Sequence, residues 1–512
     1  MPFYDSIEWE YLQNPKKFTV IPQDLKSQKN ENYHLWNTIK LRRNSRYDIE
    51  CELKSYNTEY TKFDEFKNKI ISNPKFEYEL ESNTKKLCLE FNNNNLKIFK
   101  NPHEYKFFLG ISKLKFLNKT YLEDYKKEKS NFFIKEWYLN GPNNIEFNRC
   151  TTYLKQTKII KDRKINNNSF FDNHFSHEYD TNWAEHNDFI LIKTDNLPPF
   201  IIQKVPEKFN PKYSSSIGIE YLMKGNKPTK EQRYKIQKVV SFVLGKNLIK
   251  IGETIFNKKG QIIKEYCKST EMPLSVSLES ICKSKDLNPI FYKKNNHNDL
   301  SIEENLKFII DKFFRFEKKF NLLNVIKYDL NSMIIPNESA IILIASALED
   351  LSNYWFKNSE IKKIKNKNFK LDSSEIKILE EKLKDYPKLI KKIKNKYKES
   401  GIKKRNAFFK EYNIEIGELE QDAINYRNFI GHGGKINEKN MEKLKYLVPI
   451  YRSLLNRCII KVLEYNVDYN DLIYDQPRSI NEFIPNEITE EIKYNIEKSK
   501  TKKIKYEQCK LI

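Results

Sequence analysis

The spacing of apolar residues changes about half-way along the chain. Between residues 7 and 200, short aromatic and β-branched runs, such as 106–108, 132–138 and 189–194, recur between Asn-rich turns. Such runs predict β-strands, arranged as a sandwich or a barrel. Pro198 and Pro199 interrupt what would otherwise be one long edge strand before residues 200–205. The first half is therefore expected to be rich in β-structure.

A helix and a hairpin are predicted next. Pro228 and Thr229 are expected to open a helix that runs to Leu244. Apolar residues in 248–256 can pair with those in 261–266 across a turn, which predicts a β-hairpin. The polar stretch 293–305 is the best linker candidate.

After this linker the apolar residues recur at three- and four-residue intervals, the spacing of one helix face. The pattern predicts helices over residues 306–320, 338–355, 373–397, 408–430 with a break near Asn413, and 438–465. The second helix should bury Ile341, Ile344, Leu348, Leu351 and Trp355. Pro449 would kink the last helix or end it early. Four or five antiparallel helices would form a bundle.

Composition supports a folded chain of several domains. Its 512 residues are 39% hydrophobic and 13% aromatic, which is sufficient for well-buried cores. We therefore expect an α+β protein with three parts. A β-rich N-terminal domain covers residues 1–292, an all-α bundle covers 300–470, and a polar C-terminal tail covers 471–512.

The chain shows no sequence feature of a secreted or membrane protein. Seven cysteines include no C-x2-C pair, and an odd number cannot all pair within one chain. The first twenty residues lack a basic start followed by an apolar stretch. The longest apolar run, 340–348, is too short to cross a bilayer. We expect a cytoplasmic protein without a membrane partner.

Candidate chemistry concentrates in the segment R-N-F-I-G-H, from Arg427 to His432, which Gly433 and Gly434 follow. An Arg can hold a phosphate, and a His can move protons at cellular pH. On a regular helix these two side chains lie about 140° apart, so either the helix unwinds near Gly431 or they approach a substrate from different sides. The alternative is an Arg and a His at a helix C-terminus, where cations favour the helix dipole.

The segment resembles the R-x4-6-H signature of the HEPN superfamily, in the form R-N-x-x-x-H. The preceding A-I-N-Y and the following G-G resemble in particular the ApeA-like branch, found in prokaryotic anti-phage proteins with a variable N-terminal region. The resemblance covers roughly residues 300–470. It implies a helical bundle and a metal-independent endoribonuclease that acts as a dimer and needs no cofactor.

Two polar residues are candidates for supporting roles. Glu349 lies beside the apolar stripe of the helix 338–355, where its carboxylate would orient Arg427 or His432. Members of the resembled family often carry an acid on a helix facing the motif. An exposed Glu beside the stripe is the alternative, and its neighbour Asp350 is less favoured. Asn428 would position His432 or the phosphate.

Positive charge is concentrated just before the motif. The formal net charge is +23, and residues 386–410 contain nine Lys and one Arg against a single acid, Glu399. Such a segment attracts phosphates without reading sequence. The candidate RNA contacts are Lys391, Lys392, Lys394, Lys396, Lys398, Lys403, Lys404 and Arg405. The alternative is a solvated Lys-rich helix.

The motif and the charge suggest cleavage of RNA by its own 2′-hydroxyl. Arg427 would stabilise the phosphorane, but one His432 cannot act as base and acid at once. A homodimer that faces two motifs together would supply both groups. The products would be a 2′,3′-cyclic phosphate and a 5′-hydroxyl, with no divalent metal. A tRNA is one candidate substrate, and the N-terminal domain would recognise a phage-encoded trigger, the RNA or the partner chain.

Two other functions stay open. One is a catalytically inactive HEPN-type scaffold for RNA binding or dimerisation, and the other is the toxin ribonuclease of a toxin–antitoxin pair. A zinc site at His174, His177 and His186 is less favoured, since the segment lacks a clear fourth ligand. The chain has no phosphate-binding G-x4-G-K-[ST] loop and no G-x-G-x-x-G motif, so nothing indicates a nucleoside triphosphatase or a dinucleotide enzyme.

Overall fold

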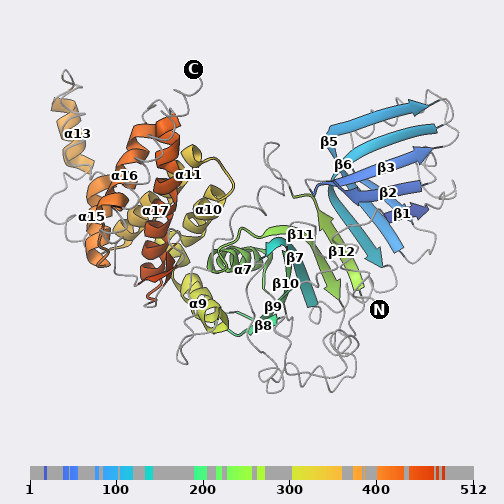
Figure 1. Cartoon of the computed structure of the whole chain (residues 1–512), viewed down its shortest axis with the longest axis horizontal. Helices are drawn as coiled ribbons and strands as arrows, with labels where there is room; N and C mark the ends of the chain where they lie inside the picture. Colours follow the sequence, from blue (N-terminus) through green and yellow to red (C-terminus); the bar gives the residue numbers. More distant parts are fainter. Residues whose placement is uncertain are drawn as a thin grey trace, which may run out of the picture. The chain divides into compact units, whose positions relative to one another are not determined.

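The computed structural model describes residues 16–19, 38–44, 47–55, 75–79, 85–101, 104–118, 133–141, 189–195, 197–204, 215–221, 228–256, 262–270, 302–359, 373–382, 384, 386, 401–431, 438–465, 469–471, 476–478 and 490. The chain divides into two compact units. The sheet unit comprises Met1–Tyr234, Leu248–Asp286 and Leu300–Lys307, and the helical unit comprises Lys235–Asn247, Leu287–Asp299 and Phe308–Ile512. Figure 1 shows the strands of the first in blue to green and most helices of the second in yellow to red.

The described strands of the sheet unit form one 12-stranded sheet in which every pairing is antiparallel. Its main path runs through β1 (Lys16–Thr19), β2 (Thr38–Arg43), β3 (Ile49–Ser55), β6 (Glu104–Asn118), β12 (Ile262–Lys268), β11 (Ile249–Phe256), β7 (Phe133–Gly141), β10 (Ser215–Tyr221), β9 (Phe200–Lys204) and β8 (Phe189–Ile192). β4 (Lys75–Glu79) pairs with β5 (Lys85–Asn101), which pairs with β6. The predicted β-rich first half is confirmed, but this path does not close as a barrel would.

The long strand β6 joins the two halves of the sheet. One edge pairs with β5, while the other pairs first with β3 and then with β12. Arg43 secures the place where β3 and β12 meet, because its guanidinium donates to the carbonyl oxygens of Lys268 at 2.9 Å and Ile251 at 3.0 Å. Burial alternates along β3, where Ile49, Cys51 and Leu53 are fully buried, as expected for one face of a sheet.

The predicted helix and hairpin after residue 228 are confirmed. α7 (Lys230–Val243) begins with a reciprocal cap, in which the Thr229 amide donates to Gln232 Oε1 at 2.8 Å and the Gln232 amide donates to Thr229 Oγ1 at 3.1 Å. β11 and β12 pair up to Phe256 and Ile262, next to the predicted turn. The division between the two units falls inside α7, between Tyr234 and Lys235.

Seven described helices after the hairpin lie wholly or largely in the helical unit. They are α9 (Ile302–Phe320), α10 (Leu322–Ser332), α11 (Asn337–Asn358), α13 (Ser373–Lys382), α15 (Gly401–Glu411), α16 (Glu418–Gly431) and α17 (Glu438–Val462). α11 contacts α10, α15, α16 and α17. Its predicted inward face is confirmed, since Ile341, Ile344, Leu348 and Leu351 are fully buried and Trp355 is nearly so.

Three predictions for this half need correction. α9 starts at Ile302, so the end of the predicted linker is helical. α10 was not predicted, although Leu322, Val325, Ile326 and Leu330 are buried at helical spacing. α17 continues through Pro449 to Val462, so an early end at the proline was wrong. The free energy lost with one backbone hydrogen bond at Pro449 is smaller than the free energy gained by burying the apolar face of this helix.

The predicted break near Asn413 is confirmed, and its geometry is that of a helix C-cap. Asn413 has a φ of 50°, in the left-handed region. The Ile414 amide donates to the Phe409 carbonyl at 2.9 Å and the Asn413 amide to the Lys410 carbonyl at 3.3 Å. This pair of bonds is a Schellman motif, which satisfies carbonyl groups at the end of α15 and directs the chain into α16.

Buried ion pairs fix helices that are distant in sequence. Arg457 Nη1 of α17 donates to Glu420 Oε1 of α16 at 2.6 Å, and both side chains are almost completely buried. The other oxygen of Glu420 accepts the Gly417 amide at 2.8 Å, which caps the start of α16. Arg452 likewise donates to Asp329 of α10 at 3.2 Å.

Two further findings concern the described residues. None of the helices in these ranges has both the length and the apolar composition that crossing a membrane requires. A short hairpin, in which β13 (Tyr469–Asp471) pairs with β14 (Gln476–Arg478), crosses the predicted boundary between the bundle and the polar tail 471–512.

Candidate functional site

The helical unit brings Arg427 of α16 and Glu349 of α11 together. Arg427 Nη2 lies 2.9 Å from Glu349 Oε1, and Arg427 Nη1 donates to Asn428 Oδ1 at 3.1 Å. The side chain of Arg427 is 28% exposed and that of Glu349 is 39% exposed. The guanidinium is therefore oriented by a carboxylate and still accessible to a ligand. Glu349 was expected to lie where its carboxylate can orient Arg427 or His432, and it does lie against Arg427.

The apolar pattern of the two helices explains why these side chains meet. On α16, Arg427 follows the buried residues Ala423 and Ile424 by four and three positions, so it continues their stripe at the end of the helix. On α11, Glu349 follows the buried Ala345 by four positions and lies at the edge of the core stripe. Both residues thus lie at the border between the buried face of their helix and the solvent-exposed face.

The other half of the motif lies outside the described residues. α16 stays helical through Gly431, and His432, Gly433 and Gly434 follow it in the part of the chain that is not described. The helix therefore does not unwind between Arg427 and Gly431. The predicted role of His432 stays a prediction.

Electrostatic effects connect the Arg427–Glu349 pair with two residues outside the motif, Tyr451 and Arg405. Tyr451 of α17 is 1% exposed, and burial raises the pKa of its hydroxyl. The charges of Arg405 and Arg427 oppose this rise in pKa, while that of Glu349 adds to it, so all three act on one phenol. Beside Arg405, the Lys404 ammonium donates at 3.2 Å to Asn353 Oδ1, one helical turn after Glu349.

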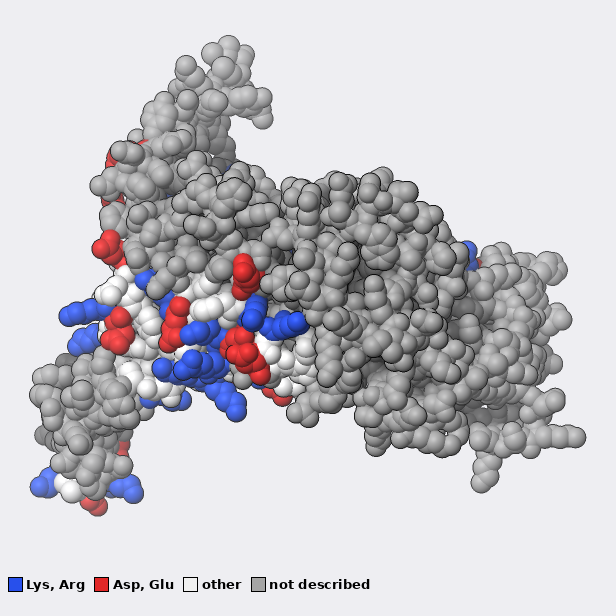
Figure 2. All heavy atoms as spheres, turned by 90° about the horizontal axis from the view of Figure 1, so that it is seen from below, with Lys and Arg blue, Asp and Glu red and all other residues white. Residues whose placement is uncertain are grey.

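The basic segment is described only in part. Lys403, Lys404 and Arg405 lie in the first turns of α15, with Lys403 exposed and the other two half-buried. The remaining candidates lie outside the described residues: Lys391, Lys392, Lys394, Lys396 and Lys398. On the face drawn in Figure 2, Lys and Arg side chains of the described part lie beside Asp and Glu side chains, so both signs of charge are present there.

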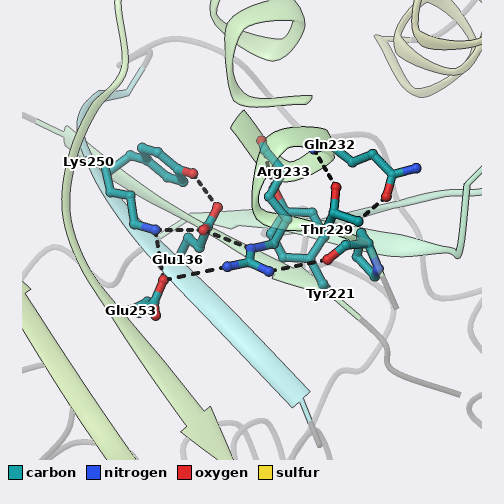
Figure 3. Close-up of polar contacts among 9 residues, drawn as sticks. Glu136, Tyr221, Thr229, Gln232, Arg233, Lys250 and Glu253 are labelled. Carbon is teal, nitrogen blue, oxygen red and sulfur yellow. Dashed lines mark hydrogen bonds and ion pairs between the residues drawn. The ribbon is translucent and has the colours of Figure 1, made fainter. Parts of the chain in front are cut away.

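A second polar cluster lies in the sheet unit, around Glu136 in the middle of β7. Figure 3 shows its carboxylate between Lys250 and Arg233. Glu136 Oε1 accepts from Lys250 Nζ at 2.6 Å and from Arg233 Nε at 3.0 Å, and Oε2 accepts from the Tyr138 hydroxyl at 2.6 Å. Lys250 also donates to Glu253 at 2.9 Å. Sequence reasoning missed this cluster, although a charged pair inside the apolar strand 133–139 was a visible signal.

The contacts of Glu136 indicate a structural role. Both carboxylate oxygens are engaged by cations and a hydroxyl within the sheet unit, and the side chain is 3% exposed. Arg233 also donates to the Pro228 carbonyl at 3.2 Å, which ties the start of α7 to the sheet. A buried carboxylate with these partners fixes geometry and leaves little capacity to bind a ligand.

No family model, curated protein or solved structure matches this chain. The expectation of a HEPN-type protein therefore rests on the sequence motif alone.

Nothing in the structure bears on the less favoured zinc site. His174, His177 and His186 lie outside the described residues. Within the described ranges, His, Cys, Asp and Glu form no group of three or more that could hold a metal ion.

The buried ion pairs of Glu136 predict that the stability of the protein depends on pH. Burial pushes its pKa up, but the charges of Lys250 and Arg233 outweigh burial and hold the pKa below its ordinary value of 4.5. A carboxyl whose pKa is lowered in the folded state stabilises the fold at a pH above its ordinary pKa. This stabilisation is lost as the pH falls through the lowered pKa of the folded state. The free energy of unfolding should therefore decrease on acidification below pH 4.5, and decrease less steeply in a Glu136→Gln variant.

Urea denaturation followed between pH 3 and 7 would measure this difference. Glu50→Gln is the matched control, because Glu50 pairs with Arg42 at 3.0 Å on the partly exposed side of β3. A surface pair of this kind contributes at most about 1 kcal/mol. Parallel pH profiles for wild type and Glu136→Gln would contradict the prediction.

Proposed function

We propose that this protein is a metal-independent endoribonuclease of the HEPN type. The single observation that carries the proposal is the ion pair between Arg427 and Glu349, at 2.9 Å, on the helix that leads into His432. It supports the proposal because an incidental Arg at a helix end would need no carboxylate from a different helix. The basic start of α15 adds a second reason, since it lies near the same residues.

The geometry of Arg427 suits a phosphate that gains charge in the transition state. A guanidinium has five N–H donors in a fixed plane. Two of its nitrogens contact Glu349 and Asn428, and the remaining donor capacity of this partly exposed group is available to phosphate oxygens. Because Glu349 fixes the plane before substrate arrives, little reorganisation is needed when the phosphorane forms.

Proton transfer requires a base for the 2′-hydroxyl and an acid for the departing 5′-oxygen. One His432 cannot do both in a single step, so we propose a homodimer in which each chain supplies one imidazole to a shared site. In this scheme the N-terminal half serves as the recognition part, in defence against phage, and RNA such as a tRNA is the substrate. A toxin ribonuclease would share this chemistry and differ in its regulation.

The chemistry of the products tests this proposal directly. The purified full-length chain, incubated with RNA in EDTA, should produce 2′,3′-cyclic phosphate and 5′-hydroxyl ends, because the nucleophile belongs to the substrate. A matched RNA with a single 2′-deoxy nucleotide at the cleaved position should stay intact there. Mass spectrometry of the fragments distinguishes these ends from 5′-phosphates. Binding without cleavage would support the inactive scaffold, and cleavage of the 2′-deoxy position would exclude the mechanism.

A further inference from the structure

We propose that Arg405 is a second phosphate-binding cation of the Arg427 site, so that one phosphate group of the ligand is held between two guanidinium groups. This inference deepens the proposed function and rests on it only for the identity of the ligand as RNA. It assigns to Arg405 a defined partner in the site, beyond general attraction by a basic segment.

The helices place Arg405 at the edge of the Arg427 site. α11 contacts both α15, which carries Arg405, and α16, which carries Arg427. The contact between Lys404 and Asn353 anchors the residue next to Arg405 to α11, one turn from Glu349. The α15 backbone is therefore held against the part of α11 that binds Arg427.

The charges of the described residues around Arg405 and Arg427 do not balance. Arg405 is half-buried, and its Nε is fully buried without a hydrogen-bond partner in the described part of the chain. No carboxylate among the described residues forms an ion pair with it, and Glu349 is already paired with Arg427. Among the described side chains of this site, two guanidinium groups face one carboxylate, which leaves one positive charge uncompensated. A partly desolvated cation of this kind is costly unless an anion is bound.

Tyr451 supports a common location for the two cations. Its buried hydroxyl is influenced by Arg405, by Glu349 and by Arg427, in that order of strength after burial itself. Because electrostatic effects fall with distance, all three groups lie near Tyr451, in agreement with the contacts that α11 makes with α15, α16 and α17.

Double-variant binding measurements test whether Arg405 and Arg427 share one phosphate. The probe is a fluorescein-labelled RNA made of 2′-O-methyl nucleotides, which binds but cannot be cleaved, with fluorescence anisotropy at fixed salt and the full-length chain. We expect Arg405→Gln and Arg427→Gln each to weaken binding roughly tenfold, because each removes a charge-assisted contact. The loss of affinity in the double variant should be clearly smaller than the product of the two single losses, since both arginines contact the same phosphate.

Arg315→Gln is the matched control, because Arg315 is an exposed Arg of α9 in the same unit. We expect this variant to weaken RNA binding by less than about threefold, because the effect of a distant surface charge is largely screened by salt. An affinity of Arg405→Gln equal to that of this control would overturn the inference. So would effects of the two variants that multiply, because independent contacts would then bind different phosphates.

Thermal unfolding of the free protein separates ligand binding from a structural role. Removing an uncompensated cation should leave the melting temperature of Arg405→Gln unchanged or raise it. If the variant instead unfolds early, Arg405→Lys keeps the charge and loses the planar fork, and it should still bind more weakly than wild type. Wild-type affinity in Arg405→Lys together with a destabilised Arg405→Gln would overturn the inference.

The outcomes also separate this inference from the ribonuclease proposal. Coupled losses of affinity in a protein that never cleaves natural RNA would support the two-arginine site and exclude the enzyme. Cleavage of natural RNA together with wild-type affinity in Arg405→Gln would support the enzyme and exclude the two-arginine site.

Discussion

Replacing His432 by alanine is expected to lower the rate of RNA cleavage by roughly 10²–10⁴-fold, because the reaction loses its general acid and base. Replacing Arg427 by alanine should lower the rate by roughly 10²–10³-fold, because the phosphorane loses a preorganised positive charge. Both rates are measured under single-turnover conditions in EDTA. Retention of wild-type cleavage by either variant would count against the catalytic assignment.

Lys443→Ala is the matched control for these variants. Lys443 of α17 pairs with Asp422 of α16 at 3.5 Å, and both side chains are more than a third exposed. The control thus removes a cation and an ion pair from the same two helices, outside the segment from Arg427 to His432, together with a contact of its ammonium with the Tyr426 ring at 5.3 Å. We expect its rate to stay within about twofold of wild type, as for other exposed pairs. A loss comparable to that of Arg427→Ala would indicate a general effect of charge or of helix packing.

Mixing wild type with His432→Ala tests the shared site. If both imidazoles of a dimer are needed, equal amounts of the two chains after random pairing should retain about one quarter of the wild-type rate at the same total concentration. If each chain acts alone, about one half should remain. Co-expression with two different affinity tags provides the mixed dimers and allows their isolation.

Replacing Glu420 by glutamine is expected to lower the free energy of unfolding of the helical unit by about 3–5 kcal/mol, since it leaves Arg457 buried and without its anion. The carboxylate accepts from Arg457 at 2.6 Å and from the Gly417 amide at 2.8 Å, so the change also weakens the cap of α16. The melting temperature should fall by roughly 6–20 °C. Circular dichroism at 222 nm and calorimetry would measure the change.

An exposed pair and an apolar replacement make this prediction specific. Asp422→Asn removes the partly exposed partner of Lys443 between the same two helices, and it should cost at most about 1 kcal/mol. The double variant Glu420→Met with Arg457→Met removes both buried charges, and it should recover much of the loss, because the desolvation cost disappears with them. Equal destabilisation by Glu420→Gln and Asp422→Asn would exclude a special role for the buried pair.

Local patterns were sufficient to predict several elements of both units. The buried stripe of α11, the break at Asn413 and the hairpin after α7 follow from periodicity and turn residues that act over a few positions. α10 escaped prediction because it is short, at 11 residues, and follows α9 after a single left-handed residue, Asn321. No Gly or Pro marks that junction, so its own apolar stripe was the remaining signal.

The candidate site was predictable where a motif and a helix face coincide. Arg427 belongs to a recognisable segment and Glu349 lies on the edge of a clear stripe, so their approach could be anticipated. Tyr451 could not, because it looks like any apolar position of α17 until the helices are packed together. Ion pairs such as Glu420 with Arg457 join residues far apart in sequence, and neither partner carries a local signal.

The division of the chain inside α7 governs how the protein can be dissected. Residues 235–247 precede the hairpin β11–β12, yet they group with the helical unit, where Lys235 contacts Glu317 of α9 at 3.2 Å. A fragment that starts near residue 300 would omit this part of the helical unit, in which Ile236, Val239, Val240 and Phe242 are fully buried. Attempts to isolate the nuclease candidate by truncation should therefore give a poorly behaved polypeptide, and inactivity of such a fragment would say nothing about the chemistry of the intact chain.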